Sequence, residues 1–360
     1  MVAVREVTPA QARDLMERGA LLVDVRDAPE LLAGMARDAV HVPRCDLLSR
    51  APQLAPDRAR TLLLMCASGV RSQQAASQLA ALGYADVHSV AGGFTRWRHE
   101  ALPTTVPRGL GDLDTERYAR QLALPEVGEA GQRRLQDARV LLIGAGGLGS
   151  PAALYLAAAG VGHLTLLDDD RVELSNLQRQ VLHRDAAVGE LKTRSGVATL
   201  EALNPRVEAR GIEARLDASN ARALLDGQQV VLDGSDNFAT RYAANDACIA
   251  LGLPCVHGSV FRFEGQVSVF WPARPGAAGP CYRCLYPEPP PAELAPSCAE
   301  AGVLGVVPGI VGLLQATEAL KLLLGVGEPL VGRMLHYDAL HARFEEFEVP
   351  RNPRCPACAA

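Results

Sequence analysis

The sequence predicts an α/β protein in which strands and helices alternate along two units. Short apolar segments such as "LLVDV" and "RVLLI" have the length and branched composition of buried strands, and helical segments follow them. Alternation of this kind is typical of parallel sheets covered by helices on both faces. A chain of 360 residues is long enough for two domains, each with its own core.

Composition excludes several classes of protein. Hydrophobic residues make up 48% of the chain and aromatic residues only 4%, which suits a globular protein rich in alanine, leucine and valine. A net charge of -5 without a basic run argues against nucleic acid as a partner. The N-terminus lacks the apolar core of a signal peptide, and no apolar run reaches the roughly 18 residues of a membrane span. We therefore expect a cytoplasmic protein with no membrane partner.

Residues 1–103 are predicted to form the first, smaller domain. A helix is expected in "TPAQARDLMERG", with Thr8 as its N-cap and Pro9 at its first position. Buried strands are expected in "ALLVDVRD" and "RTLLLMC", a helix ending at Gly83 in "SQQAASQLAALGY", and a strand followed by a turn in "DVHSVAGGFTRW". Residues 104–114 have the proline, glycine, threonine and aspartate content of a linker.

The second domain is predicted over residues 115–360. Residues 139–170 form a strand, a glycine turn, a helix and a second strand. Further helices are expected over 189–203 and in "FATRYAANDACIALG" and "PGIVGLLQATEALKLLLG", and further strands in "QQVVLD" and "GQVSVFW". The segment "YPEPPPAELAPSC" is too rich in proline for either element, so a mobile loop is expected there.

One cysteine of the first domain has the surroundings of a reactive thiol. Cys66 follows the apolar strand that ends at Met65, and the loop "CASGVRS" leads from it into a helix. The N–H groups of such a loop, the helix N-terminus and the charge of Arg71 would each stabilise a thiolate. The alternative is a buried cysteine that only packs at a strand end. Cys45 lacks a comparable loop and is assigned to packing.

Three motifs of the first domain resemble the rhodanese family over residues 4–103. They are Cys66-x4-Arg71, the earlier "LLVDVRD" and the later "VAGGFTRW". The resemblance implies a small α/β sulfurtransferase domain in which Cys66 carries a persulfide delivered by a sulfur donor. The chain departs from the family pattern at Gly34, where "GMA" stands in place of the usual Gly-His-Ile.

The second domain carries the glycine pattern of a nucleotide site. Gly144, Gly146 and Gly149 form G-x-G-x-x-G between a strand and a helix, and Asp168 ends the next strand, where an acid commonly meets a ribose hydroxyl. The pattern alone does not separate NAD or FAD from ATP, because glycines allow close backbone approach to any phosphate. The alternative for Asp168 is a residue that only ends a strand.

The residues that follow favour a triphosphate over a dinucleotide. Arg179 and Lys192 supply cations, and Asp236 follows an apolar strand as a carboxylate for Mg²⁺. A triphosphate attacked at its α-phosphate needs several positive charges, whereas an NAD site needs few. Taken singly, Arg179 or Lys192 could instead be a solvated surface residue that binds no phosphate.

Seven motifs of the second domain resemble the MoeB/ThiF family, bacterial relatives of the ubiquitin-activating enzymes. Over 115–360, in family order, they are "RYARQLALPEVG", "GAGGLGS", "LTLLDDDRVELSNLQRQ", "VGELK", "DGSDN", "CYRCLYP" and "RNPRCPAC". The resemblance implies a Rossmann-like adenylation domain with a mixed sheet. Its substrates would be ATP and the C-terminal Gly-Gly of a small ubiquitin-like sulfur-carrier protein.

The resemblance also implies a role for each matching residue. The nucleotide would contact Gly147 and Asn237, and the ribose would bind Asp168. Mg²⁺ would bind Asp236, and the phosphates would meet Asn176, Arg179 and Lys192. Arg120 of "RYARQ" would reach the triphosphate of the neighbouring subunit, which implies a homodimer.

Cysteine spacing predicts a metal site. Two C-x-x-C pairs about 70 residues apart would supply the four thiolates of a structural Zn²⁺ from Cys281, Cys284, Cys355 and Cys358. A single pair could instead be a redox dithiol. Cys298 follows the proline-rich segment at a position where the family often has a cysteine, which joins the acyl or sulfur relay in some members and is dispensable in others. Cys248 and Cys255 fall in a predicted helix and strand and are assigned to the core.

These features together predict an ATP-dependent sulfur-carrier adenylyltransferase joined to a sulfurtransferase. The carrier would become a thiocarboxylate through sulfur from Cys66, for cofactor biosynthesis such as that of molybdopterin or thiamine. An NAD-dependent oxidoreductase is one alternative, although it would have no use for Arg179, Lys192 and the cysteine pairs. A non-catalytic module that holds a carrier protein is another, which the intact Arg120 and Asp236 disfavour.

Overall fold

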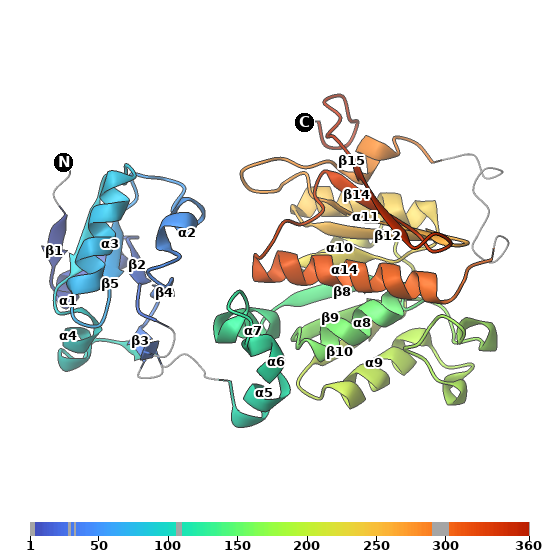
Figure 1. Ribbon diagram of the computed structural model, residues 1–360, viewed down its shortest axis with the longest axis horizontal. Helices are drawn as coiled ribbons and strands as arrows, with labels where there is room; N and C mark the ends of the chain where they lie inside the picture. The colour runs from blue at the N-terminus through green and yellow to red at the C-terminus, as the bar shows by residue number, and fades with distance from the viewer. Residues whose placement is uncertain (1–3, 28–29, 32–33, 106–109, 290–301, 360) are drawn as a thin grey trace. The chain divides into compact units, whose positions relative to one another are not determined.

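The computed structural model describes residues 4–27, 30–31, 34–105, 110–289 and 302–359 (Figure 1). The chain divides into two compact units, Met1–Leu113 and Asp114–Ala360. Within the predicted linker, Thr104–Thr105 form strand β7 and helix α5 (Asp112–Arg117) begins, while 106–109 lie outside the described ranges. Each unit has its own sheet, helices and hydrophobic core.

The first unit is built on a five-stranded sheet whose neighbouring strands are all parallel. In order across the sheet, the strands are β1 (Arg5–Val7), β6 (Val87–Val90), β5 (Leu62–Met65), β2 (Leu21–Asp24) and β4 (Val40–His41). The helices are α1 (Pro9–Glu17), α2 (Leu47–Leu54), α3 (Val70–Ala81) and α4 (Gly93–His99), and β3 (Met35–Ala36) pairs antiparallel with β7.

Both faces of this sheet are covered, because side chains alternate between them along each strand. On β5, Leu62 and Leu64 belong to one hydrophobic cluster with residues of α2 and α3, and Leu63 and Met65 belong to another with residues of α1 and α4. Helix α1 begins as predicted, with Thr8 as the N-cap of a capping box.

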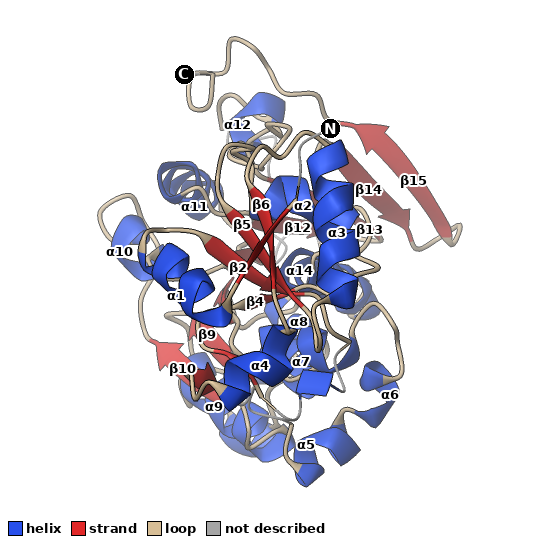
Figure 2. Cartoon of the chain, turned by 90° about the vertical axis from the view of Figure 1, so that its left-hand side faces the viewer, coloured by secondary structure: helices blue, strands red, loops and turns tan. Residues whose placement is uncertain are grey.

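The second unit is built on an eight-stranded mixed sheet, which confirms the predicted fold class. In order across the sheet, the strands are β10 (Glu208–Ile212), β9 (His163–Leu167), β8 (Arg139–Ile143), β11 (Val230–Asp233), β12 (Cys255–Phe261), β13 (Glu264–Phe270), β14 (Arg333–Asp338) and β15 (Arg343–Glu348). Neighbours from β10 to β12 are parallel, and those from β12 to β15 are antiparallel. Figure 2 shows the β14–β15 hairpin at the edge of this sheet.

Helices cover both faces of the parallel part of this sheet. One face carries α7 (Gly128–Gln136), α8 (Gly149–Ala158), α9 (Lys192–Leu203) and α14 (Val306–Leu324), and the other carries α10 (Ala221–Leu225), α11 (Phe238–Leu251) and α12 (Tyr282–Leu285). Val140 and Leu142 of β8 pack toward the first face, and Leu141 and Ile143 toward the second. Shorter elements are α6 (Ala119–Leu122), η2 (Leu174–Asn176) and η3 (Asp185–Ala187).

Helix α14 is long and apolar enough to cross a membrane by length and composition, which the search for apolar runs in the sequence missed. Core helices of soluble proteins pass the same test. Here α14 contacts β12, β13 and α8, and Val307, Val311 and Ala319 are fully or almost fully buried in the core. Because these residues pack in the core of the second unit, we interpret α14 as a core helix.

Candidate functional site

A glycine turn joins β8 to α8 and sets the floor of a cavity. Gly144 has a φ of 91°, in the left-handed region that favours glycine. A Cβ atom at Gly149 would lie 1.8 Å from the carbonyl oxygen of Gly144, so only glycine fits there. A Cβ atom at Gly144 would likewise lie 3.2 Å from the carbonyl oxygen of Gly234. The turn therefore brings the end of β8, the start of α8 and the exit of β11 close together.

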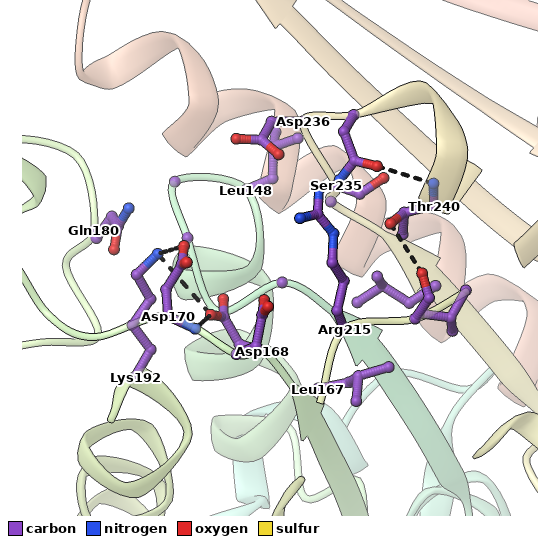
Figure 3. Close-up of a pocket in the computed structure, with 18 of the residues that line it drawn as sticks. Leu148, Leu167, Asp168, Asp170, Gln180, Lys192, Arg215, Ser235, Asp236 and Thr240 are labelled. Carbon is purple, nitrogen blue, oxygen red and sulfur yellow. Dashed lines mark hydrogen bonds and ion pairs between the residues drawn. The ribbon is translucent and has the colours of Figure 1, made fainter. Parts of the chain in front are cut away.

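The cavity above this turn has a volume of about 350 Å³ and lies at the carboxyl ends of β8, β9 and β11 (Figure 3). In open parallel sheets, that is where ligands bind. The predicted site residues that line it are Gly144, Gly146, Gly147, Asp168, Arg179, Lys192, Asp236 and Asn237. Three other residues that were predicted to act at the nucleotide do not line it: Gly149 starts α8, Asn176 lies in η2, and Arg120 is exposed on α6.

Asp168 and Lys192 lie side by side on one wall of the cavity (Figure 3). The Asp168 carboxylate accepts hydrogen bonds from the N–H of Ala145 at 2.8 Å and the N–H of Asp170 at 2.9 Å. Lys192 Nζ lies 2.6 Å from Asp170 Oδ2 and 4.0 Å from Asp168 Oδ1. Burial raises the pKa of the Asp168 carboxyl above its ordinary value, although the charge of Lys192 opposes that shift.

Asp236 and Asn237 form the opposite wall, in the turn between β11 and α11. Asn237 is the N-cap of α11, and its Oδ1 accepts a hydrogen bond from the N–H of Thr240 at 2.9 Å. Asp236 precedes it and is exposed, so its carboxylate is open to a ligand in the cavity. Arg179 Nη1 donates to the carbonyl oxygen of Ser175 at 3.0 Å, which holds this guanidinium at the cavity.

The cavity is also lined by polar residues to which the sequence assigned no role, among them Gln180, Arg215 and Arg241. Gln180 is 4% exposed, and its Oε1 has no hydrogen-bond partner among the described residues. Arg241 donates to the carbonyl oxygen of Ser235 from Nη2 at 3.0 Å. A signal for Arg241 was present, because it lies four residues after the N-cap Asn237 and so shares its face of α11.

Cys66 lies at the end of β5 and is 1% exposed. Its Sγ accepts hydrogen bonds from the N–H of Gly69 at 3.1 Å and from Ser72 Oγ at 3.4 Å. Burial alone would raise the pKa of this thiol, but hydrogen bonds from Ser72 and from loop N–H groups outweigh it and lower the pKa. Arg71 forms a bidentate ion pair with Glu30, at 2.6 and 2.7 Å.

Helix α4 lies where the sequence predicts only a turn, and its first turn is hydrogen-bonded to the Cys66 loop. The N–H of Phe94 donates to the carbonyl oxygen of Cys66 at 2.8 Å, and the N–H of Thr95 donates to that of Ala67 at 3.1 Å. A Cβ atom at Gly93 would lie 2.2 Å from the Cys66 carbonyl oxygen, so this approach requires glycine. The start of α4 thereby fixes the backbone on which the thiol sits.

The two C-x-x-C pairs converge, and their four sulfurs lie within 4.8 Å of one another. The Sγ atoms of Cys281 and Cys355 are 3.5 Å apart, and so are those of Cys284 and Cys358. Four sulfurs bound tetrahedrally at ~2.3 Å from a zinc ion would lie about 3.8 Å apart, so the spacing fits that metal. Cys298 lies outside the described residues, and Cys248 and Cys255 are buried in the core.

Family models match both units. The model of the ThiF family matches residues 118–357, and that of the rhodanese-like domain matches residues 8–100. A "Sulfur carrier protein adenylyltransferase" of Thermus thermophilus is 53% identical over 68% of this chain and 91% of its own length. The "SAMP-activating enzyme E1" of Haloferax volcanii is 53% identical over 68% of this chain and 88% of its own length.

More distant structures share the fold. Escherichia coli MccB, solved with ATP, superposes with a TM-score of 0.58 at 22% identity, over 69% of this chain and 76% of MccB.

The "Probable adenylyltransferase/sulfurtransferase MoeZ" of Mycobacterium tuberculosis is a further sequence relative, 51% identical over 68% of this chain and 62% of its own length. The family model covers two thirds of the sequence, and relatives that are 53% identical cover a similar share of it. This chain belongs to the ThiF family and carries a rhodanese-like domain ahead of its ThiF domain.

Proposed function

We propose that the second unit transfers AMP from ATP to the C-terminal carboxylate of a small ubiquitin-like sulfur-carrier protein ending in Gly-Gly. The first unit then supplies sulfur from Cys66, so that the carrier becomes a thiocarboxylate. One observation carries the proposal: Arg179, Lys192 and Asp236 converge on a cavity at the ends of β8, β9 and β11. The names of two relatives support it, since one is a "Sulfur carrier protein adenylyltransferase" and the other a "SAMP-activating enzyme E1".

Adenylation requires an anion to attack an anion, so the residues must offset repulsion. Lys192 and Arg179 would contact the phosphates and stabilise the charge that develops on the pyrophosphate leaving group. Asp236 would hold Mg²⁺, which supplies further positive charge to the phosphates when bound. The carrier carboxylate is already ionised at neutral pH, so the chemistry needs no general base. Asp168 lies where it would accept a ribose hydroxyl.

Sulfur transfer begins at the Cys66 thiolate, which takes a sulfane sulfur from a persulfide donor. The terminal persulfide sulfur then attacks the acyl carbon of the adenylate. The bond between that carbon and the phosphate oxygen breaks, and AMP leaves. A second thiol must attack Cys66 Sγ in the resulting acyl disulfide, which releases the thiocarboxylate and leaves a disulfide at Cys66. Alternatively, Cys298 relays the acyl group or the sulfur.

Three further properties belong to the same proposal. The four-cysteine cluster would hold a structural Zn²⁺, because four thiolates leave no open coordination position. The chain would act as a cytoplasmic homodimer in which Arg120 reaches the triphosphate of the neighbouring subunit. The thiocarboxylate would serve molybdopterin or thiamine biosynthesis.

Exchange of label between pyrophosphate and ATP tests the proposal. The full chain, with Mg²⁺ and candidate carriers, should catalyse exchange only with a carrier that ends in Gly-Gly with a free carboxylate. The same carrier without its last glycine is the matched control. Tight binding of NAD together with no binding of ATP would favour the oxidoreductase, and carrier binding without exchange would favour the non-catalytic module.

A further inference from the structure

A buried carboxylate and a buried imidazole lie next to the nucleotide cavity, and the mechanism above uses neither. Asp233 is the last residue of β11, and His257 is its register partner on the neighbouring strand β12. Their side chains join through His257 Nδ1 and Asp233 Oδ2, which are 2.9 Å apart. The two residues are 2% and 5% exposed, so this contact is shielded from water.

The Asp233 carboxylate links β12 to the turn that carries Asp236. Its Oδ1 accepts two hydrogen bonds from Ser235, one from the N–H at 3.0 Å and one from the hydroxyl at 2.6 Å. Burial would raise the pKa of the Asp233 carboxyl, but hydrogen bonding, first of all with His257, outweighs burial and lowers that pKa, whereas burial lowers the pKa of His257 itself. The Asp233 carboxylate thus contacts His257 Nδ1 on one side and both donor groups of Ser235 on the other, and Ser235 is held next to Asp236.

Neither end of this link is free to move. The His257 ring packs against Phe270 and Tyr282, with ring centroids 5.8 and 5.1 Å apart, so its nitrogen is fixed in place. On the cavity side, Arg241 donates to the carbonyl oxygen of Ser235 from Nε and Nη2. Ser235 is thus held at its N–H, its hydroxyl and its carbonyl.

We propose that His257 is a positioning residue for adenylation. Through Asp233 it fixes Ser235, and so it fixes the direction in which the next residue, Asp236, presents its carboxylate to the metal–nucleotide complex. The inference rests on the proposed function, which assigns Asp236 to Mg²⁺. Partners that orient metal-ligating groups commonly change metal affinity or activity by about 10–100-fold when lost.

Two amides at position 257 separate this role from mere packing. The amide nitrogen of His257→Asn lies where Nδ1 does and still donates to Asp233, whereas that of His257→Gln lies one bond further out. Binding of Mn²⁺ to the full chain with a non-hydrolysable ATP analogue, followed by electron paramagnetic resonance, should weaken about 10–100-fold in His257→Gln. It should stay within about threefold of wild type in His257→Asn. Binding of the analogue without metal should change in neither variant.

A matched control exists in the first unit. His88 is also buried and joined to an aspartate, Asp86, at 2.8 Å, so His88→Gln should leave Mn²⁺ binding unchanged. If His257→Gln does not fold, Ser235→Ala removes the hydroxyl hydrogen bond at the other end of the same link and should weaken Mn²⁺ binding.

The inference would be overturned if His257→Gln, or Ser235→Ala in its place, bound Mn²⁺ as tightly as wild type. It would also be overturned if His257→Gln and His257→Asn lost Mn²⁺ affinity equally. Absence of exchange in the wild-type chain would instead refute the proposed function, since Mn²⁺ and nucleotide binding need no carrier.

Discussion

Replacing Lys192 with methionine should abolish most adenylation while leaving the fold intact. Methionine keeps most of the apolar stem and removes only the charge. Lys192 is the first residue of α9, and its side chain is 8% exposed, whereas that of its partner Asp170 is 66% exposed. An ion pair with so exposed a partner contributes under about 1 kcal/mol to stability. The free energy of unfolding should therefore change little.

The catalytic effect should be much larger, because ATP in the cavity would exclude water from the Lys192 ammonium. A single preorganised charge at such a site is commonly worth about 10²–10³ in rate, or roughly 2.7–4 kcal/mol of transition-state stabilisation. Pyrophosphate exchange in Lys192→Met should fall by that factor. Thermal unfolding of the same sample should remain close to that of wild type.

The chain supplies its own control, since it contains only two lysines, Lys192 and Lys321. Lys321 pairs with Glu318 at 2.6 Å on α14 and does not line the cavity, so Lys321→Met should keep full exchange. Labelling with an amine reagent gives a second readout: bound ATP should protect Lys192 and leave Lys321 reactive. Exchange within about threefold of wild type in Lys192→Met, with no protection by ATP, would refute the reasoning.

Four other outcomes follow from the two sites. Cys66→Ala should abolish sulfur transfer and thiocarboxylate formation but leave pyrophosphate exchange at the wild-type rate; a folded variant that lost exchange would place the thiol in adenylation. Ser72→Ala removes a hydrogen bond that lowers the Cys66 pKa, so the pH profile of thiol alkylation should move to higher pH, and an unmoved profile would assign the thiolate to other groups. Wild type should bind roughly one zinc per chain, and Cys355→Ser should lose that zinc and unfold at a lower temperature; absence of zinc from wild type would refute the metal site. Mixing Arg120→Ala chains with Lys192→Met chains should restore exchange to about a quarter of wild type, since half of the dimers then hold one intact site; no restoration would contradict the shared site.

The parts of the fold that the sequence predicts are those whose signals are local. Thr8 marks the start of α1 and the glycine turn marks the junction of β8 and α8, because caps and turns depend on a few neighbouring residues. The strands β14 and β15 give no such signal. Every residue of β15 is exposed, so its sequence "RFEEFE" lacks a consistently buried face from which a strand could be predicted.

The candidate site divides in the same way. Lys192 and Asp236 could be selected because each follows an element with a clear pattern and carries a charge suited to phosphate or metal. The partnership of Asp233 with His257 could not, because it depends on the register between two parallel strands separated by α11. Nothing in the residues around His257 specifies that register, which is set by packing across the whole sheet.

The cysteine cluster also bears on the order in which the second unit folds. Cys281 and Cys355 are 74 residues apart, and the segment between them contains α14 and the β14–β15 hairpin. A metal that joined them would close a loop of that length, which lowers the entropy of the unfolded chain by the equivalent of about 4–5 kcal/mol in a chain-entropy treatment. The β14–β15 hairpin lies between the two cysteines, so we expect metal capture to be favoured once the hairpin has formed and shortened that loop. Chains awaiting it would expose unligated thiols, and the yield of folded protein should then depend on how soon metal arrives relative to oxidation.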